Sequence, residues 1–596
     1  MNNELAQADL DHTMALAGLL LDLADASVAQ NDREQALIWT HVASKVLTSQ
    51  NRELFSPRVE RSLRLFGGWL PPFSRLAAPA PAHPGDKQRW LHVINQALPY
   101  GGHTPMATLW MQGCRGGRTH SVALLMQKTA APDELAAAVR DSGGSLHTAP
   151  LDAPLLDRAR WLRTLAASSA DYVLLHVDPD DVIAPTAFAA EGGPPVLLFN
   201  HAAHIYWNGA SIPDVIVNCR GSKLEEQWTR VHRGALRCAT VPIPLLTPGE
   251  DESHGVGESA RKERARQLLG LPKDAVVMLT SGDSYKFAPL GRLDFIAVCE
   301  DILRRLPQAI LVAIGPVEDE RWLAARERTG SRLRTFGRQP RSQVPIFLQA
   351  ADVYIEGFPF GSTTALLEAG LRGIPVVLAP AQCPPPYGTD GVALDDVLER
   401  SCNFEEYKSQ IIALCQNSRE RAALGARLRD SIQEHHTASG WRNYVEEAIR
   451  IAPRTHSTSP IAAPVPTPAD VHLHWSAFRR ATFPDFEHLV ENMVRYAFGL
   501  GARPLPPEQA GRAARSRIAA RLYAEIAEQF QGRGDVVAAK RFYACSVSSD
   551  PWLLKIRVRK LLLSLGPTGA LLRRVARRFK AGRTLKVVNG PARSRA

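Results

Sequence analysis

Cysteine is scarce in this chain, and no long apolar run is present. The eight cysteines among 596 residues are scattered, and no two of them form a Cys-x-x-Cys pair. This spacing argues against a zinc knuckle or a disulfide framework and is typical of a protein in a reducing cytosol. No apolar run approaches the roughly 20 residues that a membrane-spanning helix needs. The first residues also lack the basic start and apolar core of an export signal, so we expect a cytoplasmic protein.

Acidic residues are missing from the C-terminal end. After Asp550 there are 13 Lys and Arg and no Asp or Glu, so the net charge of +11 leaves −2 for residues 1–550. Leucines alternate with the arginines of this tail, a pattern typical of weak contact with an anionic membrane at its inner face. A merely solvated tail is the alternative. Nucleic acid is not expected as a partner, because no aromatic platforms accompany the charges.

Composition shifts divide the chain into seven parts. Apolar residues at helical spacing predict helical segments at both ends, each resembling one tetratricopeptide hairpin, and Pro-rich stretches predict linkers. The predicted parts are an N-terminal helical segment (1–70), a linker (71–88), an N-terminal sheet domain (89–246), a C-terminal sheet domain (263–450), a Pro-rich linker (451–468), a C-terminal helical segment (469–550) and the basic tail (551–596).

Short apolar runs alternate with helical stretches in both central domains. The runs of the first domain are 90–95, 122–127, 172–177, 196–200 and 215–218, and those of the second are 276–280, 309–314, 333–336, 353–355 and 376–378. This alternation predicts an α/β fold with two doubly wound parallel sheets, each covered by helices on both faces. Ligands of such folds bind at the carboxyl ends of the strands.

Two strand-to-helix corners of the second sheet carry residues suited to phosphate. Gly361 allows close approach of the backbone, and the hydroxyls of Ser362, Thr363 and Thr364 stand at a helix start, where free N–H groups and the dipole favour a diphosphate. Capping of the helix by these hydroxyls is the alternative. At the first corner, Lys286 would add a cation facing the same cleft. Together the two corners favour a diphosphate site over a cap and a surface lysine.

This half of the chain resembles the nucleotide-sugar domain of GT-B glycosyltransferases, and most of all the group of O-GlcNAc transferase and bacterial cytosolic N-glycosyltransferases (family 41). The likeness rests on Tyr285-Lys286, Ala351-Asp352-Val353, Phe358-Pro359-Phe360-Gly361-Ser362-Thr363-Thr364, Glu368 and Gly373-Ile374-Pro375-Val376-Val377. That group has an aspartate at the place of Glu368, one residue nearer the threonines. The spacing from Glu368 to Pro375 equally resembles the retaining family 4, whose earlier glutamate is replaced here by Phe360.

The resemblance implies roles for the donor-site residues. Lys286 would neutralise the leaving diphosphate, Gly361, Ser362, Thr363 and Thr364 would bind its oxygens, and Glu368 would contact the ribose. Arg338 and Gln339 would lie near the base. Such sites work without a metal, so we expect no cofactor beyond the nucleotide-sugar donor, a UDP-sugar.

Two histidines are candidate bases for the acceptor's proton. His103 follows the first strand in a Gly-rich turn, and His201 follows the strand at 196–200 beside aromatic residues. The stretch Asp178-Pro179-Asp180-Asp181 mimics a metal motif, but proline and acidic residues after a strand predict a helix start.

These patterns favour a glycosyltransferase that moves a hexose or N-acetylhexosamine from a nucleotide sugar to a protein or glycan acceptor. Inversion is the expected stereochemistry, with retention as the alternative. Two other functions fit the same fold, a UDP-sugar 2-epimerase and a non-catalytic scaffold whose helical ends bind partners.

Overall fold

The chain forms two compact units in the computed structural model. The larger comprises Met1–Leu10 and Thr48–Thr482, and the smaller comprises Asp11–Leu47 and Phe483–Ala596. The residues described are 3–49, 53–76, 87–99, 102–114, 116–246, 258–290, 293–380, 389, 391–463, 465–468, 485–504, 516–550 and 554–564. Both predicted sheets lie in the larger unit.

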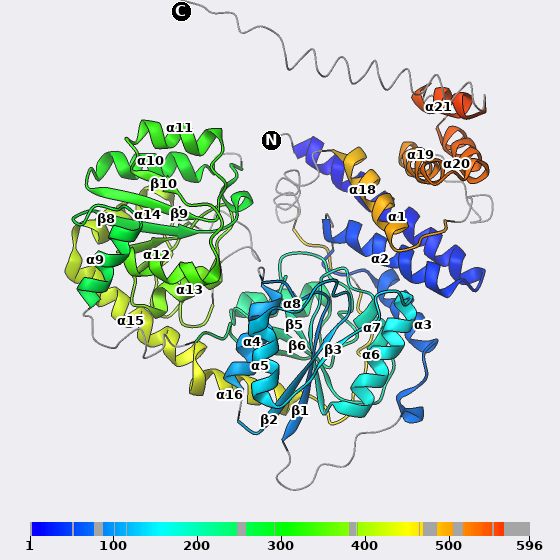
Figure 1. Ribbon diagram of the computed structural model, residues 1–596, viewed down its shortest axis with the longest axis horizontal. Coiled ribbons are helices and arrows are strands. Elements are labelled where there is room, and N and C mark those ends of the chain that lie inside the picture. The colour runs from blue at the N-terminus through cyan, green and yellow to red at the C-terminus, as the bar shows by residue number, and fades with distance from the viewer. Residues whose placement is uncertain are drawn as a thin grey trace, which may run out of the picture. The chain divides into compact units, whose positions relative to one another are not determined.

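The first sheet has seven parallel strands in the order β3-β2-β1-β4-β5-β6-β7. Its strands are β1 (Gln88–Ile94), β2 (Arg118–Leu124), β3 (Leu146–Thr148), β4 (Tyr172–His176), β5 (Val196–Asn200), β6 (Val215–Asn218) and β7 (Cys238–Thr240). In Figure 1, α4 (His103–Gly113) and α5 (Asp133–Ser142) cover one face, and α6 (Leu155–Ser169) and α7 (Ile183–Phe188) cover the other. Burial on both faces explains why β4, β5 and β6 read as nearly continuous apolar runs.

The second sheet has five parallel strands in the order β10-β9-β8-β11-β12. They are β8 (Val276–Ser281), β9 (Ala309–Ile314), β10 (Leu333–Thr335), β11 (Val353–Ile355) and β12 (Val376–Val377). Helices α10 (Phe295–Arg305) and α11 (Glu320–Arg328) lie on one face, with α12 (Val344–Ala350) and α13 (Thr363–Leu371) on the other (Figure 1). The two sheets confirm the predicted fold class, the GT-B architecture.

The sequence signals for individual helices are visible in α10. The Asp294 carboxylate accepts a hydrogen bond from the Ala297 amide at 3.2 Å, which caps the helix. Its buried side chains recur at three- and four-residue spacing, in the set Phe295, Ile296, Cys299, Ile302 and Leu303. One face of the helix is therefore committed to the core of the second sheet.

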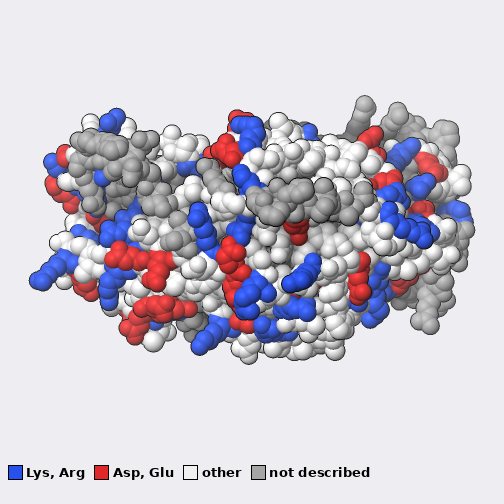
Figure 2. Space-filling model, turned by 90° about the horizontal axis from the view of Figure 1, so that it is seen from below, with Lys and Arg blue, Asp and Glu red and all other residues white. Residues whose placement is uncertain are grey.

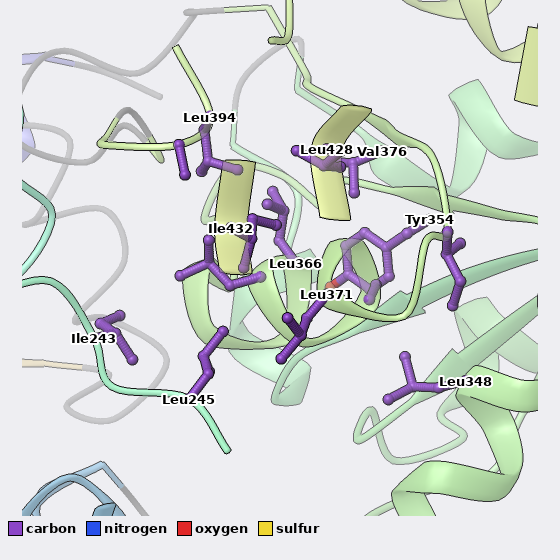
Figure 3. Packing of buried hydrophobic residues seen from close by; sticks show 14 of the residues in the cluster. Ile243, Leu245, Leu348, Tyr354, Leu366, Leu371, Val376, Leu394, Leu428 and Ile432 are labelled. Atoms are coloured by element: carbon purple, nitrogen blue, oxygen red, sulfur yellow. The ribbon is translucent and has the colours of Figure 1, made fainter. Parts of the chain in front are cut away.

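One hydrophobic core joins both sheets within the larger unit. Side chains from α13, from α15 (Ser418–His436) and from the segment after β7, including Ile243 and Leu245, gather in one cluster (Figure 3). Helix α14 (Phe404–Gln416) precedes α15, and α16 (Ala438–Ile451) follows it and packs against β7 and α4. The Trp441 ring on α16 contacts the Trp110 ring edge-on, and its Nε1 donates to Pro242 O at 2.7 Å.

Helix α16 thus differs from its assignment in the sequence. It falls inside the stretch predicted as the second sheet domain (263–450), but it lies against the first sheet. The Trp441 side chain is 1% exposed. A buried tryptophan of that size contributes about 3–5 kcal/mol, so the tertiary contact outweighs continuity along the chain.

The helical ends are also divided differently from the prediction. Helix α3 (Pro57–Gly68) belongs to the larger unit, because the buried Glu60 carboxylate accepts hydrogen bonds from the Gly209, Ala210 and Ser211 amides. Most of α1 (Asn3–Ala29) and α2 (Arg33–Ser49) instead belong to the smaller unit, with α18 (Phe486–Gly499), α19 (Arg517–Gly532), α20 (Val536–Ser549) and α21 (Leu554–Ser564). The helix pair expected near 520–551 is α19 and α20, whereas the tetratricopeptide likeness stays a prediction.

Helices from the N-terminal and C-terminal parts of the chain contact each other inside the smaller unit. The Gln35 side chain donates to Gly501 O at 3.1 Å and accepts from the Arg503 amide, and His41 contacts the Tyr496 hydroxyl at 2.7 Å. Residues far apart in the sequence therefore share one helical core. Within α1, the stretch Gln7–Ala29 is long and apolar enough to cross a membrane, by length and composition alone. This contradicts the sequence prediction that no such run is present. In the structure, however, 44% of the most apolar 18 residues of this stretch are buried inside the protein.

Charge on the body of the protein is mixed. On the face shown in Figure 2, basic and acidic side chains intermingle, as the near-zero net charge before Asp550 leads one to expect. Of the basic tail, only α21 lies among the described residues, and there Arg559 pairs with Glu528 while Leu563 is buried. Membrane contact was predicted for the whole basic tail (551–596), and the part of the tail after Ser564 lies outside the described residues.

Candidate functional site

A cavity of about 780 Å³ opens between the carboxyl ends of the two sheets. The first sheet contributes residues that follow β1, β5 and β6, and the second contributes residues that follow β8 and β11. Such a cavity lies within the size range of ligand pockets and at the edge where doubly wound sheets bind their ligands.

The corner before α13 does not behave as a helix cap. Ser362 occupies the N-cap position of this helix, but its side chain makes no capping hydrogen bond. Instead its Oγ accepts from Lys286 Nζ at 3.1 Å, and Gly361 O accepts from the same ammonium at 2.9 Å. The first amides of α13 therefore face a cavity lined by Gly361, Ser362, Thr363 and Thr364. The two predicted donor corners come together through Lys286.

Gly361 is required by its neighbours. A Cβ built on it would lie 2.3 Å from the Thr389 methyl and 2.4 Å from Glu356 Oε1. Glu356 is buried, accepts from the Ala379 amide at 2.8 Å and pairs with Arg400 at 3.3 Å. Burial raises the pKa of Glu356, opposed mainly by the Arg400 charge. A fixed carboxylate network beneath the corner thus leaves no room for a side chain.

Lys286 is held in a poorly solvated position. It lies on a single helical turn, Ser284–Phe287, which Asp283 begins by accepting from the Ser284 amide at 2.7 Å. Burial lowers the pKa of Lys286 to about 8, while the charges of Asp283 and Glu356 act in the opposite direction. The side chain is therefore mostly charged at neutral pH, and no carboxylate forms an ion pair with it among the described residues. A bound anion would supply that partner.

Glu368 reaches the same cavity one turn further along α13. Its Oε1 accepts from the Arg341 guanidinium at 2.8 Å, and both residues line the cavity. Arg341 was not singled out in the sequence. It lies on the short turn Arg341–Gln343, away from any strand end, so the corner pattern carries no signal for it.

Arg338 and Gln339 are placed differently from the other predicted donor residues. The Arg338 side chain is 72% exposed and pairs with Asp283 at 2.6 Å, and the Gln339 amide donates to Phe336 O. Neither is among the residues that line the cavity. Their predicted place near the base stays a prediction, and the structure does not bring them to the diphosphate corner.

The two candidate histidines lie against each other. Their rings stack with centroids 4.2 Å apart, and His201 lines the cavity. His103 begins α4, with its Nδ1 3.5 Å from Asp178 Oδ1. Burial lowers the pKa of His103 to about 4 and also lowers the pKa of His201. Both imidazoles are therefore neutral near pH 7 and able to accept a proton.

Arg220 is a cavity residue that the sequence analysis missed. It follows β6, its side chain is 9% exposed, and its Nε lies 3.6 Å from the buried Glu225 carboxylate. The same strand-end rule that selected Lys286 could have selected it. The pKa of the neighbouring His204 falls to about 3 because of burial and then the charges of Arg220 and Lys286. Basic side chains thus line the cavity from both sheets, Arg220 from the first and Lys286 from the second, together with the carboxylates of Glu225 and Glu368.

The acidic stretch after β4 directly precedes α7, which begins at Ile183 with Val182 at its N-cap, so the acids lie before the helix and not in its first turn as predicted. Asp181 accepts hydrogen bonds from the Ile183 and Ala184 amides at 3.3 and 2.8 Å, and from the Asn95 side chain at 2.7 Å. Burial raises the pKa of Asp181 to about 7. Within the described part of the chain, no group of three or more His, Cys, Asp or Glu is arranged to hold a metal ion.

Comparisons with known proteins found likenesses among solved structures. No family model matches the sequence, and no curated protein matches it significantly. Among solved structures, a variant of the Thermobaculum terrenum O-GlcNAc transferase aligns with a TM-score of 0.44 and 15% identity over 74% of this chain and 84% of that one. Anabaena HepE in complex with UDP and glucose aligns with a TM-score of 0.45 and 15% identity over 61% and 99%.

A glycosyltransferase from Rickettsia africae aligns with a TM-score of 0.48 and 12% identity, over 61% of this chain and 98% of that one. These are similarities of shape at low identity. We therefore describe the architecture of this chain from its strand order, and its site from the residues that line the cavity.

Proposed function

We propose that the larger unit is a glycosyltransferase that moves a hexose or N-acetylhexosamine from UDP to a protein or glycan acceptor, with inversion at the sugar carbon. The observation that carries this proposal is the contact of Lys286 with Gly361 and Ser362 at an uncapped helix start. The first residues of a helix, hydroxyls and the Lys286 ammonium converge there, while the nearby Glu356 carboxylate is already held by Thr389, Ala379 and Arg400. That combination is matched to a diphosphate.

The opposite wall of the cavity supports the transfer step. In that step the acceptor's oxygen or nitrogen attacks the anomeric carbon, and the bond from that carbon to the diphosphate breaks with its electron pair leaving on the diphosphate. A neutral imidazole of His201 or His103 takes the acceptor's proton. Lys286 and Arg220 stabilise the charge that develops on the leaving group. The protein thereby supplies the cations that this step requires.

The proposal of a protein acceptor rests on the helical segments at the two ends of the chain. Helices at both chain ends form a unit of their own, which suits recruitment of a protein. We also propose that this chain acts in the cytoplasm, which the scattered cysteines support.

The donor site is tested by thermal unfolding with UDP, GDP, ADP or CMP. A ligand that binds only the folded state raises the melting temperature according to its concentration relative to Kd. We expect UDP to stabilise the wild type more than the other nucleotides, and Lys286→Ala to remove that stabilisation. Lys273→Ala is the matched control, because Lys273 is 70% exposed and forms an ion pair with Glu263 on the surface of the same domain.

The outcomes separate the candidate functions. Release of UDP from a UDP-sugar, with transfer of the sugar to an acceptor, would support the transferase. Conversion of the sugar without transfer would support an epimerase. Binding without turnover would support a scaffold, and no stabilisation by any nucleotide would overturn the donor site.

A further inference from the structure

Four histidines form a continuous hydrogen-bonded row across the first sheet, which we name the histidine row: His120, His92, His176 and His201. His92 Nε2 lies 3.0 Å from His120 Nδ1, and His92 Nδ1 lies 3.2 Å from His176 Nε2. His176 Nδ1 lies 3.1 Å from His201 Nε2. The row therefore runs from the interior of the sheet to the wall of the cavity.

The sheet register produces this row. The strands that carry it are neighbours, in the order β2-β1-β4-β5. His120 is in register with Trp90, two residues before His92, and His92 is in register with Leu174, two residues before His176. Because side chains alternate with a period of two, each step keeps the same face and moves toward the carboxyl edge. His201 lies one residue beyond the end of β5 and completes the diagonal.

The contact at the inner end of the row decides which nitrogen of His120 carries the proton. His120 Nε2 lies 3.4 Å from the backbone oxygen of Cys114. A carbonyl only accepts, so this contact is a hydrogen bond only when Nε2 carries the proton. A neutral imidazole has one donor nitrogen and one acceptor nitrogen, so His120 Nδ1 must then accept from His92. For the same reason His92 Nδ1 must accept from Nε2–H of His176, and His176 Nδ1 must accept from Nε2–H of His201.

We propose that His120, His92 and His176 are positioning residues that hold His201 in its Nε2–H tautomer and leave its Nδ1 unprotonated as the proton acceptor at the cavity. The reverse arrangement would set the His120 lone pair against the Cys114 carbonyl. His201 Nδ1 has no hydrogen-bond partner among the described residues, and His201 is part of the cavity wall. This inference rests on the proposed function only in naming what the free nitrogen does.

The surroundings of the row keep its imidazoles neutral and any added proton near the cavity. His92, His120 and His176 are each 0% exposed. Burial lowers the pKa of His176 to about 3 and of His120 to about 4. At the inner end Arg118, which pairs with Glu446, opposes a positive charge on His120. At the outer end Asp178 lies near His103, which stacks on His201.

The test reads the tautomers directly. In the full-length protein labelled with ¹⁵N-histidine, long-range proton–nitrogen correlation distinguishes Nε2–H from Nδ1–H imidazoles, and single substitutions assign the signals. We expect all four histidines of the row in the Nε2–H form. His120→Phe should make His201 a mixture of tautomers, although His120 is not among the residues that line the cavity.

Two further variants separate positioning from packing. His120→Gln keeps an acceptor oxygen and a donor amide, so it should restore the single tautomer of His201. His147→Phe alters β3 of the same sheet outside the row and should change nothing. An Nδ1–H form of His176 or His201 in the wild type overturns the inference, and so does an unchanged His201 in folded His120→Phe.

Turnover gives the second measurement. His120→Phe should lower kcat about tenfold and leave KM for the donor unchanged, with recovery in His120→Gln. If the tautomers are as expected but no sugar transfer occurs, the proposed function fails and the row stands. If transfer occurs with the opposite tautomers, the row fails and the proposed function stands.

Discussion

The two walls of the cavity respond differently to the same loss of solvent. On the second sheet, burial lowers the pKa of Lys286 to about 8, and the group keeps its charge at neutral pH. On the first sheet, burial lowers the pKa of His103 to about 4, and the group is neutral. Desolvation always disfavours the charged form, but lysine starts about four pKa units above histidine. One physical effect thus produces a cationic donor wall and a neutral acceptor wall.

The largest effect should come from breaking the acceptor wall. Loss of a general base costs about 10²–10⁴ in rate, so we expect His201→Ala to lower kcat by that factor. Steady-state kinetics should show an unchanged KM for the UDP-sugar, because the donor wall is intact. Gln112→Ala on α4, a residue that does not line the cavity, serves as the control. An equal loss in both variants would assign the defect to folding.

Breaking the donor wall should have the next largest effect. Lys286→Ala removes a cation at the developing diphosphate charge, for which about 10²–10³ in kcat is typical. We expect kcat/KM to fall by at least that factor in an assay of UDP release. Lys273→Ala should match the wild type. Wild-type turnover of the Lys286→Ala variant would show that Lys286 does not take part in the donor site.

The pH dependence of donor binding sharpens the comparison. The ammonium form of Lys286 binds the diphosphate, so a bound ligand raises its pKa above the value of about 8 in the free protein. Affinity for UDP should be level below pH 8 and should fall about tenfold per unit above it, until the pKa of the complex is reached. Titration calorimetry at several pH values measures this, and Lys286→Ala should lose the dependence. The histidines of the other wall stay neutral across this range.

The smallest effect is expected at Arg341. Its pair with Glu368 involves a guanidinium that is 50% exposed, and such pairs are worth about 0.2–1 kcal/mol. Arg341→Ala should therefore change KM for the UDP-sugar by no more than about fivefold, measured with kcat in the same assay. A larger loss would mean that Arg341 contacts the donor directly.

Most strands were readable from the sequence because they are buried on both faces. The runs at 309–314 and 353–355 coincide with β9 and β11. β2 was placed too late, since it begins at Arg118 with polar side chains. Two of these, Arg118 and His120, are buried by tertiary contacts, such as that of Arg118 over the Trp90 ring. β3 and β7 were missed because each has only three residues at a sheet edge.

The candidate site was readable in part for the same reason. Corner residues such as Lys286 and Ser362 follow apolar strands, and the carboxyl ends of parallel strands meet at one edge, so local pattern was sufficient to group them. Arg341 follows no strand. Three histidines of the row stand on strands separated by helices, and His201 follows a fourth strand. One of them, His120, lies in the polar start of β2.

The sequence by itself determined the two sheets, the corners that face the cavity and the identity of the groups at those corners. Each of these follows from local periodicity and from the residue types that follow a strand. The tertiary structure alone decided that Lys286 contacts Ser362 rather than solvent, that α16 returns to the first sheet, and that four histidines align. These depend on strand order, register and burial, which bring together residues that no local pattern connects.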